Sequence, residues 1–236
     1  QTIAFTVTQA LTIDGNSAIL DGAGAAGAAF RASGGGDIAV SNLTVQNSPG
    51  DGIAVDVPAA ATGIIHLSLF KVNAIDNAGF GVILNDQVDP TTADGVQPNA
   101  GGSAASVAVS VVNSRFIRNG YSVSDRDGLR VNEGGDGDLS ITIKHSLAQD
   151  NAADGIEVDE RGTGDILIDM FGTSVTGNGR LDPADLDDGF DVDEYNDGSI
   201  LGTIFSSSAS DNYEEGFDIN ENNAGDFKVD MYLVNA

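Results

Sequence analysis

The feature that most constrains this chain is an internal repeat. A strand-like run, an Asn, a short gap, a Gly and a second strand-like run recur six times. The Asn members are Asn47, Asn77, Asn119, Asn151, Asn178 and Asn212, and the Gly members are Gly52, Gly81, Gly128, Gly155, Gly189 and Gly216. The units span 37–63, 64–105, 106–138, 139–165, 166–199 and 200–226; three have 27 residues and the others are longer through an insertion. Such a repeat predicts an architecture of stacked, equivalent units.

Alternation of apolar and polar residues identifies the repeating element as a β-strand. Segments 106–112, 139–144 and 166–171 carry apolar residues at every second position, which predicts strands with one buried face. Gly, Asn and Asp separate these runs, as turns require. We therefore expect an all-β solenoid in which each strand pairs in parallel with its equivalent in the next coil. A β-propeller is the main rival, but its blades need about 40 residues or more.

The opening segments resemble a known family. TIAFTVTQALTIDGNSAILDG at 2–22 and GGGDIAVSNLTVQNS at 34–48 are similar to the first coils of β-helix domains in secreted and cell-surface bacterial proteins. Together with the repeat, they make the whole chain resemble the right-handed parallel β-helix of the pectate-lyase-like superfamily. That superfamily includes polysaccharide lyases, hydrolases, epimerases, adhesins and phage tailspikes, so the fold does not select one function.

The resemblance implies one domain over residues 1–236, with about seven to eight coils stacked at the spacing of parallel strands. We expect opening coils in 1–36, then the six units, then the first strand of a further coil in 227–236. No capping segment follows this strand. Because a solenoid needs its terminal edges covered, we expect either a piece of a longer chain or end-to-end self-association.

The charge is strongly acidic. The chain has 36 acidic and 10 basic side chains, a net charge of -26 and no cysteine. A nucleic-acid partner is disfavoured because binding phosphates needs a basic face. Membrane insertion is disfavoured because no apolar run approaches the ~20 residues required. Residues 106–236 carry a net charge of -19, against -7 for residues 1–105, so the acidic surplus belongs mainly to the second half.

In that half, three positions of the repeat become acidic. The predicted metal ligands are Glu133, Glu157, Asp159, Glu160, Asp191, Asp193, Glu194, Asp218 and Glu221. Strand alternation is expected to place the columns through Glu157 and Asp159 on the solvent side. Neighbouring carboxylates would then repel each other by ~0.9 kcal/mol even in water. Three features could relieve this repulsion: raised carboxyl pKa values, the positive charges of Arg130 and Arg161, or bound cations. Hard oxygen ligands favour calcium; the alternative is a solvated acidic face.

The other columns predict structural roles. The Asn column is expected to form a hydrogen-bonded ladder, and the Gly column marks either a positive φ or crowding. A further column, Asp37, Asp138, Asp165 and Asp226 with Ser199 in the fifth unit, is expected to cap turns, with a ligand role as the alternative. His66 and His145 lie on different coils and are interpreted as ordinary strand or turn residues.

Two insertions suggest where a site could lie. Residues 120–127 and 179–188 lengthen the gap between Asn and Gly, and both are expected at one corner, flanking Glu157, Asp159 and Arg161. A third insertion spans roughly 86–105. Binding residues often lie on such loops of a rigid scaffold, although neutral drift at a permissive corner is an equal alternative.

We predict a secreted or cell-surface β-helix with a structural or adhesive role, whose acidic ladder binds calcium. The alternative is a calcium-dependent polysaccharide-active enzyme acting in a groove over the third to fifth coils. Superfamily lyases use an Arg or Lys base, for which Arg130, Lys144 and Arg161 are the candidates. A glycosidase would instead use two carboxylates from Glu157, Asp159, Asp191 and Asp193. Carbohydrate is the expected partner in either case.

Overall fold

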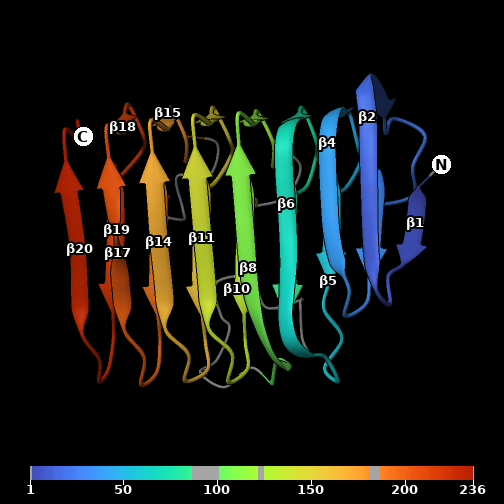
Figure 1. The fold of residues 1–236 in the computed structure, drawn as a ribbon. Helices are drawn as coiled ribbons and strands as arrows, with labels where there is room; N and C mark the ends of the chain where they lie inside the picture. The colour runs from blue at the N-terminus through green and yellow to red at the C-terminus, as the bar shows by residue number, and fades with distance from the viewer. Residues whose placement is uncertain (1, 87–100, 122–124, 181–186, 236) are drawn as a thin grey trace.

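The computed structural model describes residues 2–86, 101–121, 125–180 and 187–235. Within these residues the chain forms strands and turns without any helix, and every strand pair is parallel (Figure 1). One sheet, sheet A, contains β1 (Ile3–Thr6), β3 (Phe30–Ser33), β5 (Ile53–Asp56), β7 (Val82–Asp86), β10 (Leu129–Glu133), β13 (Ile156–Glu160), β16 (Phe190–Glu194) and β19 (Phe217–Glu221), in that order.

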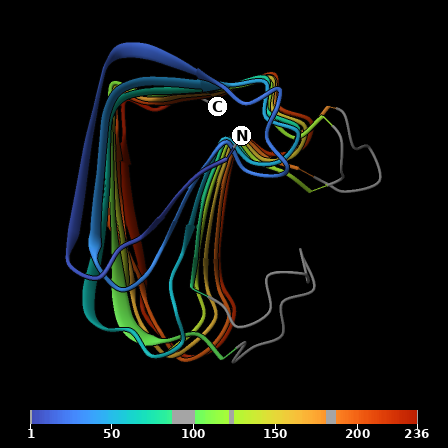
Figure 2. The ribbon, with the colours of Figure 1, turned by 90° about the vertical axis from the view of Figure 1, so that its right-hand side faces the viewer.

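The second sheet, sheet B, wraps around the rest of each coil. It contains β2 (Ala10–Asp21), β4 (Asp37–Gln46), β6 (Thr62–Ile75), β8 (Ala104–Val112), β9 (Arg115–Ile117), β11 (Leu139–Lys144), β12 (Leu147–Gln149), β14 (Ile166–Phe171), β15 (Ser174–Thr176), β17 (Ile200–Phe205), β18 (Ser208–Ser210) and β20 (Phe227–Tyr232). The chain passes from a sheet A strand to a long sheet B strand, bends, and returns through a short strand (Figure 2).

The bend in sheet B depends on one residue per coil. His145 and Ser206 lie at the bend with a left-handed φ of 52°, and Gly172 lies there with a φ of 59°. A left-handed residue turns the chain sharply between two extended segments. This geometry separates β11 from β12 and β17 from β18, while the first coils keep one continuous strand around the corner.

Apolar side chains fill the interior. In β11, Leu139, Ile141 and Ile143 are fully buried, while the residues between them face outward. Register pairs Ile141 with Val109 of β8 and Ile168 of β14, so equivalent apolar residues stack along the axis. The molecule is therefore an all-β solenoid of stacked parallel strands, as the alternating pattern predicted.

A ladder of Asn side chains follows one corner. The Nδ2 of Asn119 donates to Oδ1 of Asn151, and the Nδ2 of Asn151 donates to Oδ1 of Asn178, each at 3.0 Å. The same oxygens accept main-chain N–H groups from the preceding coil. Asn77 and Asn212 extend the ladder at its two ends. These bonds satisfy polar groups that the coil buries.

Asn47 lies outside this ladder, contrary to the prediction. The register places Ser48 in the column, and its N–H donates to Oδ1 of Asn77. Asn47 is exposed, has a φ of 55° and donates to Oδ2 of Asp21. The spacing explains the error, because Ser48, not Asn47, is separated from Gly52 by the three residues found in the regular units.

The Gly column is explained by crowding. At Gly128 an added Cβ would lie 2.6 Å from Nδ2 of Asn151 and 2.5 Å from the carbonyl oxygen of Gly155. The same close approach recurs at Gly155, next to Asn178. Glycine therefore makes room for the Asn amide of the following coil.

Candidate cation site

The acidic columns predicted from the sequence are brought together on adjacent strands of sheet A. Register aligns Arg130 with Glu157, Asp191 and Asp218, and Asn132 with Asp159, Asp193 and Asn220. Glu133, Glu160, Glu194 and Glu221 form a third column at the ends of the same strands. All nine predicted ligands thus lie on β10, β13, β16 and β19.

The solvent exposure expected for these columns was wrong on β10 and β13, whereas Asp191, Asp193 and Asp218 are partly exposed. Arg130 is 2% exposed, Glu157 5% and Asp159 0%. Residues just before β10 and β16 lie against these columns: Nη1 of Arg130 contacts Asp125 at 3.2 Å and Asp127 at 3.4 Å, and a carboxylate oxygen of Asp188 lies within 4.8 Å of one of Asp191. The ends of the two insertions therefore cover the outward face of the strands, which an alternation pattern alone does not reveal.

Arg130 neutralises the first part of the acidic cluster. Its guanidinium donates to Oε2 of Glu157, and to Oδ2 of Asp159 at 2.9 Å. Burial opposes the charged form, but Glu157, Asp159 and the other surrounding carboxylates outweigh this effect and raise the pKa of Arg130 well above its usual value. Arg130 therefore acts as a fixed internal cation.

Arg161 provides a second positive charge to the same carboxylate. Its Nη2 lies 2.8 Å from Oδ2 of Asp159, and its guanidinium stacks on the Tyr195 ring at 3.4 Å from the centroid. The Tyr195 hydroxyl in turn donates to Asp193 at 2.5 Å. Sequence analysis did not identify Tyr195, which follows the acidic column without repeating in other units.

The next part of the cluster has no such cation. Asp188, Asp191 and Asp218 each offer a carboxylate oxygen, and these oxygens lie within 4.8 Å of one another. In the described part of the chain no basic side chain forms an ion pair with them. Burial, followed by repulsion from neighbouring carboxylates, raises the pKa of Asp191 to about 9. For Asp188, burial and the acidic groups around it raise the pKa to about 7.

Asp191 also has an unsatisfied oxygen. Its Oδ1 is inaccessible to solvent and has no hydrogen-bond partner. By contrast, Oδ1 of Asp188 accepts the N–H of Glu215 at 2.6 Å, and Oδ2 of Asp218 accepts Nδ2 of Asn220 at 2.9 Å. A buried, unpaired carboxylate oxygen is costly, and a hard cation bound by the three carboxylates would satisfy it.

The Glu column is a separate feature. Each Glu carboxylate accepts the N–H two residues later, as in Glu160 to Gly162 at 2.7 Å and Glu194 to Asn196 at 2.8 Å. Glu133, Glu160 and Glu194 are completely buried. Burial raises the pKa of Glu133 to about 7, and burial together with hydrogen bonding to Glu133 raises that of Glu160 to about 10. These side chains cap turns on the strand face opposite Asp159, and the raised pKa values favour protonated carboxyl groups there.

Sequence analysis missed another acidic ladder. Oδ1 of Asp127 accepts the N–H of Asp154 at 3.1 Å, and Oδ1 of Asp154 accepts the N–H of Asp188. The signal was present in the sequence, because Asp127, Asp154 and Asp188 each directly precede the Gly of their repeat unit. These carboxylates increase the negative charge around Asp191.

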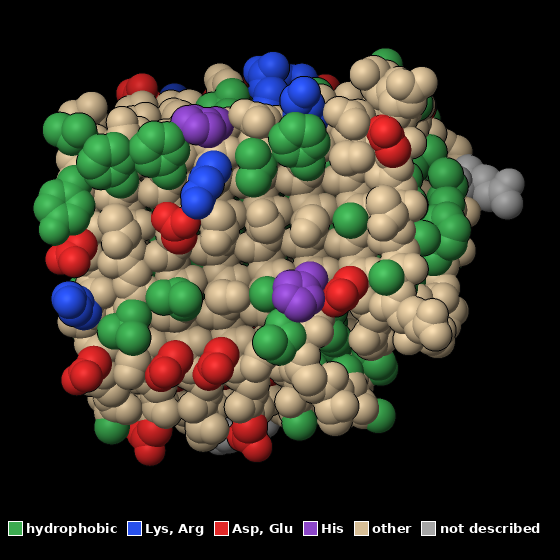
Figure 3. All heavy atoms as spheres, in the orientation of Figure 1, with side chains coloured by type: hydrophobic (Ala, Val, Ile, Leu, Met, Phe, Trp, Pro, Cys, Tyr) green, Lys and Arg blue, Asp and Glu red, His purple; other side chains and the backbone are tan. Residues whose placement is uncertain are grey.

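The remaining predicted residues lie elsewhere. Lys144 was expected near the acidic columns, but it lies on sheet B, where its Nζ forms an ion pair with Asp169 at 2.7 Å. The outer face of that sheet carries acidic and basic side chains scattered among uncharged ones (Figure 3). His66 pairs with Asp37 at 2.9 Å, and His145 packs edge-on against Phe171.

The predicted turn-capping column bonds between coils. Oδ1 of Asp138 accepts the N–H of Asp165 at 3.1 Å, and Oδ1 of Asp165 accepts the N–H of Ser199 at 2.9 Å. Asp37 and Asp226 take part in equivalent bonds. The side chains of Asp37, Asp138, Asp165 and Ser199 thus each hold the start of the next long strand in sheet B.

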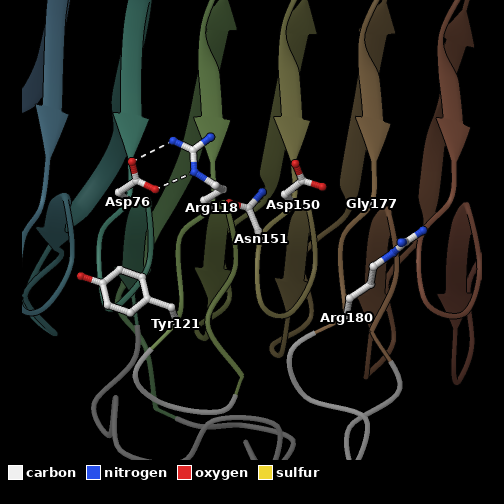
Figure 4. Close-up of a pocket in the computed structure, with 7 residues that line it drawn as sticks. All are labelled: Asp76, Arg118, Tyr121, Asp150, Asn151, Gly177 and Arg180. Carbon is white, nitrogen blue, oxygen red and sulfur yellow. Dashed lines mark hydrogen bonds and ion pairs between the residues drawn. The ribbon is translucent and has the colours of Figure 1, made fainter.

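The described parts of the predicted walls lie at two places: Asp125 and Asp127, at the end of the first insertion, contact Arg130 beside Glu157, whereas the starts of both insertions line a cavity. Residues 122–124, 181–186 and 87–100 of the three insertions lie outside the described residues. Tyr121 and Arg180, at the starts of the first two insertions, line a cavity of about 480 Å³ together with Asp76, Arg118, Asp150, Asn151 and Gly177 (Figure 4). This cavity does not include Glu157 or Asp159.

Comparison of the chain with protein-family models, curated proteins and solved structures gives no match. The described residues also contain no helix with the length and apolar character needed to cross a membrane. The fold and the site define a class of protein: an all-β solenoid of parallel strands with an acidic cluster, buried in part, on sheet A.

Proposed function

We propose that this chain is a structural or adhesive solenoid, secreted or displayed at the cell surface, whose acidic cluster binds calcium. In detail, we propose the right-handed parallel β-helix of the pectate-lyase-like type, with about seven to eight coils at the spacing of parallel strands and base units of 27 residues. The observation that carries the calcium proposal is the group formed by Asp188, Asp191 and Asp218, which is acidic, buried at Asp188 and partly buried at the other two, and without a basic partner in the described chain.

The contrast between neighbouring strands supports a cation at this position. Around β10 and β13, Arg130 and Arg161 balance Glu157 and Asp159. Around β16 and β19 the column carries Asp191 and Asp218 and no arginine. Calcium takes about six to eight oxygen ligands, often from carboxylates that bind through both oxygens. The all-oxygen donor set favours calcium over softer metals.

Thermal unfolding with calcium and with a chelator tests the proposal. A ligand bound only by the folded state adds about 2.7 kcal/mol of stability at a free concentration of 100 Kd, or roughly 5–10 °C in Tm for a domain of this size. We expect Asp191→Asn to abolish the calcium-dependent shift while the metal-free protein stays folded. Asp230→Asn, at an exposed position of β20, should retain the shift. A wild-type Tm that changes neither with calcium nor with the chelator would contradict the proposal.

The calcium-dependent polysaccharide-active enzyme is the second candidate, and the site supports it less well. A proton-abstracting base must be accessible and must release its own proton near the working pH. Arg130 and Arg161 are buried and ion-paired, and acidic neighbours raise the pKa of both despite the opposing effect of burial. Lys144 lies on the other sheet. Incubation with alginate, pectate and related glycans, followed by absorbance of unsaturated products, tests this alternative; product formation would overturn the structural role.

End-to-end self-association is a further proposal. Strands β1 and β20 are the outermost members of their sheets, and apolar side chains are exposed on them, among them Phe5, Phe227 and Tyr232. Unpaired strand edges bind other edges, and head-to-tail contacts of this kind build fibres. Sedimentation over a range of protein concentrations tests it: a single monomeric species throughout would contradict self-association.

A further inference from the structure

The cavity beside the short strands of sheet B has the composition of a ligand site. It measures about 480 Å³, within the range of about 300–1,000 Å³ typical of small-molecule sites. In Figure 4, Asp76, Arg118, Asp150 and Gly177 come from successive coils at one corner, and Tyr121 and Arg180 stand at the sides where the two insertions leave the coils. It is separate from the acidic cluster on sheet A.

A row of left-handed residues builds the floor of this cavity. Asp76, Arg118 and Asp150 have φ values of 55°, 53° and 53°, and Gly177, the next member of the row, has a φ of 72°. A Cβ at Gly177 would lie 2.5 Å from Oδ1 of Asp150. Because Gly177 has no side chain, the Asp150 carboxylate can lie directly against its main chain.

Some polar groups of the cavity already form hydrogen bonds with the protein, and others do not. Arg118 donates from Nε and Nη2 to the two carboxylate oxygens of Asp76, at 2.7 and 2.8 Å. Arg180 donates to the carbonyl oxygen of Asp211 at 3.1 and 2.6 Å. The Asp150 side chain has neither a hydrogen bond nor an ion pair within the described residues. Tyr121 is 56% exposed, so its ring is accessible at the edge.

The charges of the cavity balance. The lining contains two arginines and two aspartates in a chain whose net charge is -26. Such a site has no strong preference for an anion or a cation. It offers instead an acceptor at Asp150, a remaining guanidinium N–H at Arg118 and an aromatic ring at Tyr121. A neutral ligand that carries hydroxyl groups and an apolar ring face matches all three.

We propose that this cavity binds one sugar unit of a neutral glycan. Asp150 accepts hydrogen bonds from neighbouring hydroxyl groups, Arg118 donates to a sugar oxygen, and Tyr121 packs against the C–H face of the ring. Charge-assisted hydrogen bonds of this kind are among the stronger polar contacts. Binding here requires no metal, and the site goes beyond the calcium proposal because neither depends on the other.

Isothermal titration and NMR titration with a defined panel test the proposal. The panel consists of cellotetraose, maltotetraose and mannotetraose as neutral probes, with trigalacturonate as an anionic probe and spermidine as a cationic probe. We expect at least one neutral probe to bind in the presence of EDTA, and to bind more tightly than trigalacturonate or spermidine. Tighter binding of either charged probe, or no binding of any neutral probe, would overturn the proposal.

Two variants and a matched control locate the binding. Asp150→Asn keeps a residue that tolerates the left-handed conformation but removes the charged acceptor, so affinity should fall about tenfold or more. Tyr121→Ala should weaken binding to a similar extent. Asp230→Asn makes the same chemical change at an exposed position of β20, outside the cavity lining; affinity should not change. Unaltered affinity in Asp150→Asn would place the ligand elsewhere and overturn the assignment.

Discussion

At the scale of single residues, the solenoid is held by polar side chains that bond from one coil to the next. Asn151 shows how much one side chain does: it donates to Asn178 and to the carbonyl oxygen of Phe116, and accepts from the N–H and the Nδ2 of Asn119. All of this occurs out of contact with water. Losing one donor therefore leaves several buried groups without partners.

The Asn ladder gives a residue-scale prediction with a matched control. Asn151→Asp replaces a buried donor by an acceptor that faces Oδ1 of Asn178, and we expect it to cost about 3 kcal/mol or more in free energy of unfolding. Asn47→Asp makes the same change at the exposed position outside the ladder and should alter stability little. Urea unfolding of both variants measures the difference; equal effects would show that the ladder does not carry this stability.

Buried carboxyl groups give a pH dependence. Burial, with acidic neighbours, raises the pKa of Glu133 to about 7, Asp191 to about 9 and Glu160 to about 10 in the folded state, whereas unfolded carboxyl groups titrate near pH 4. The folded state therefore binds more protons over this interval, and stability falls as pH rises. We expect the Tm of the metal-free protein to decrease from pH 5 to pH 9. Glu160→Gln, neutral at every pH, should reduce the slope; a Tm that increases over this range would contradict the assignment.

At the scale of strands, alternation and spacing predicted the β-structure and much of the site. Apolar residues after each Gly identified β10, β13, β16 and β19, and their register followed from aligning those residues. The burial of Arg130 and Glu157 did not follow, because it depends on Asp125 and Asp127 from outside the strand. The cavity also escaped prediction, since Asp76, Arg118 and Asp150 belong to a row of turn residues with no shared chemistry.

The stacked core gives a strand-scale prediction. Ile141 lies at the centre of β11, fully buried between Val109 and Ile168. Ile141→Ala should destabilise the protein by about 2–5 kcal/mol through lost burial and the cavity left behind. Thr142→Ala, on the outer face of the same strand, should change stability by about 0.5 kcal/mol or less. Urea denaturation compares them, and similar losses in both variants would contradict the assigned inward face.

At the scale of the whole molecule, charge and stacking act against each other. A net charge of -26 disfavours a compact state, while parallel pairing holds equivalent carboxylates close together. We expect the Tm of the metal-free protein to rise with sodium chloride, because the screening length falls from ~30 Å at ~0.01 M to ~3 Å at ~1 M. Thermal scans across this range measure the effect. A Tm that does not respond would mean that the buried arginines and protonated carboxyl groups already neutralise the repulsion.

The variable gap between the Asn and Gly columns has a practical consequence. Three residues separate Asn151 from Gly155 and ten separate Asn178 from Gly189, yet the N–H of Ile156 still donates to the carbonyl oxygen of Gly189. Extra chain at this corner leaves the winding of the core undisturbed. The corner is therefore a natural place to graft foreign peptides, and successive coils would present them in a row at the regular separation of neighbouring strands.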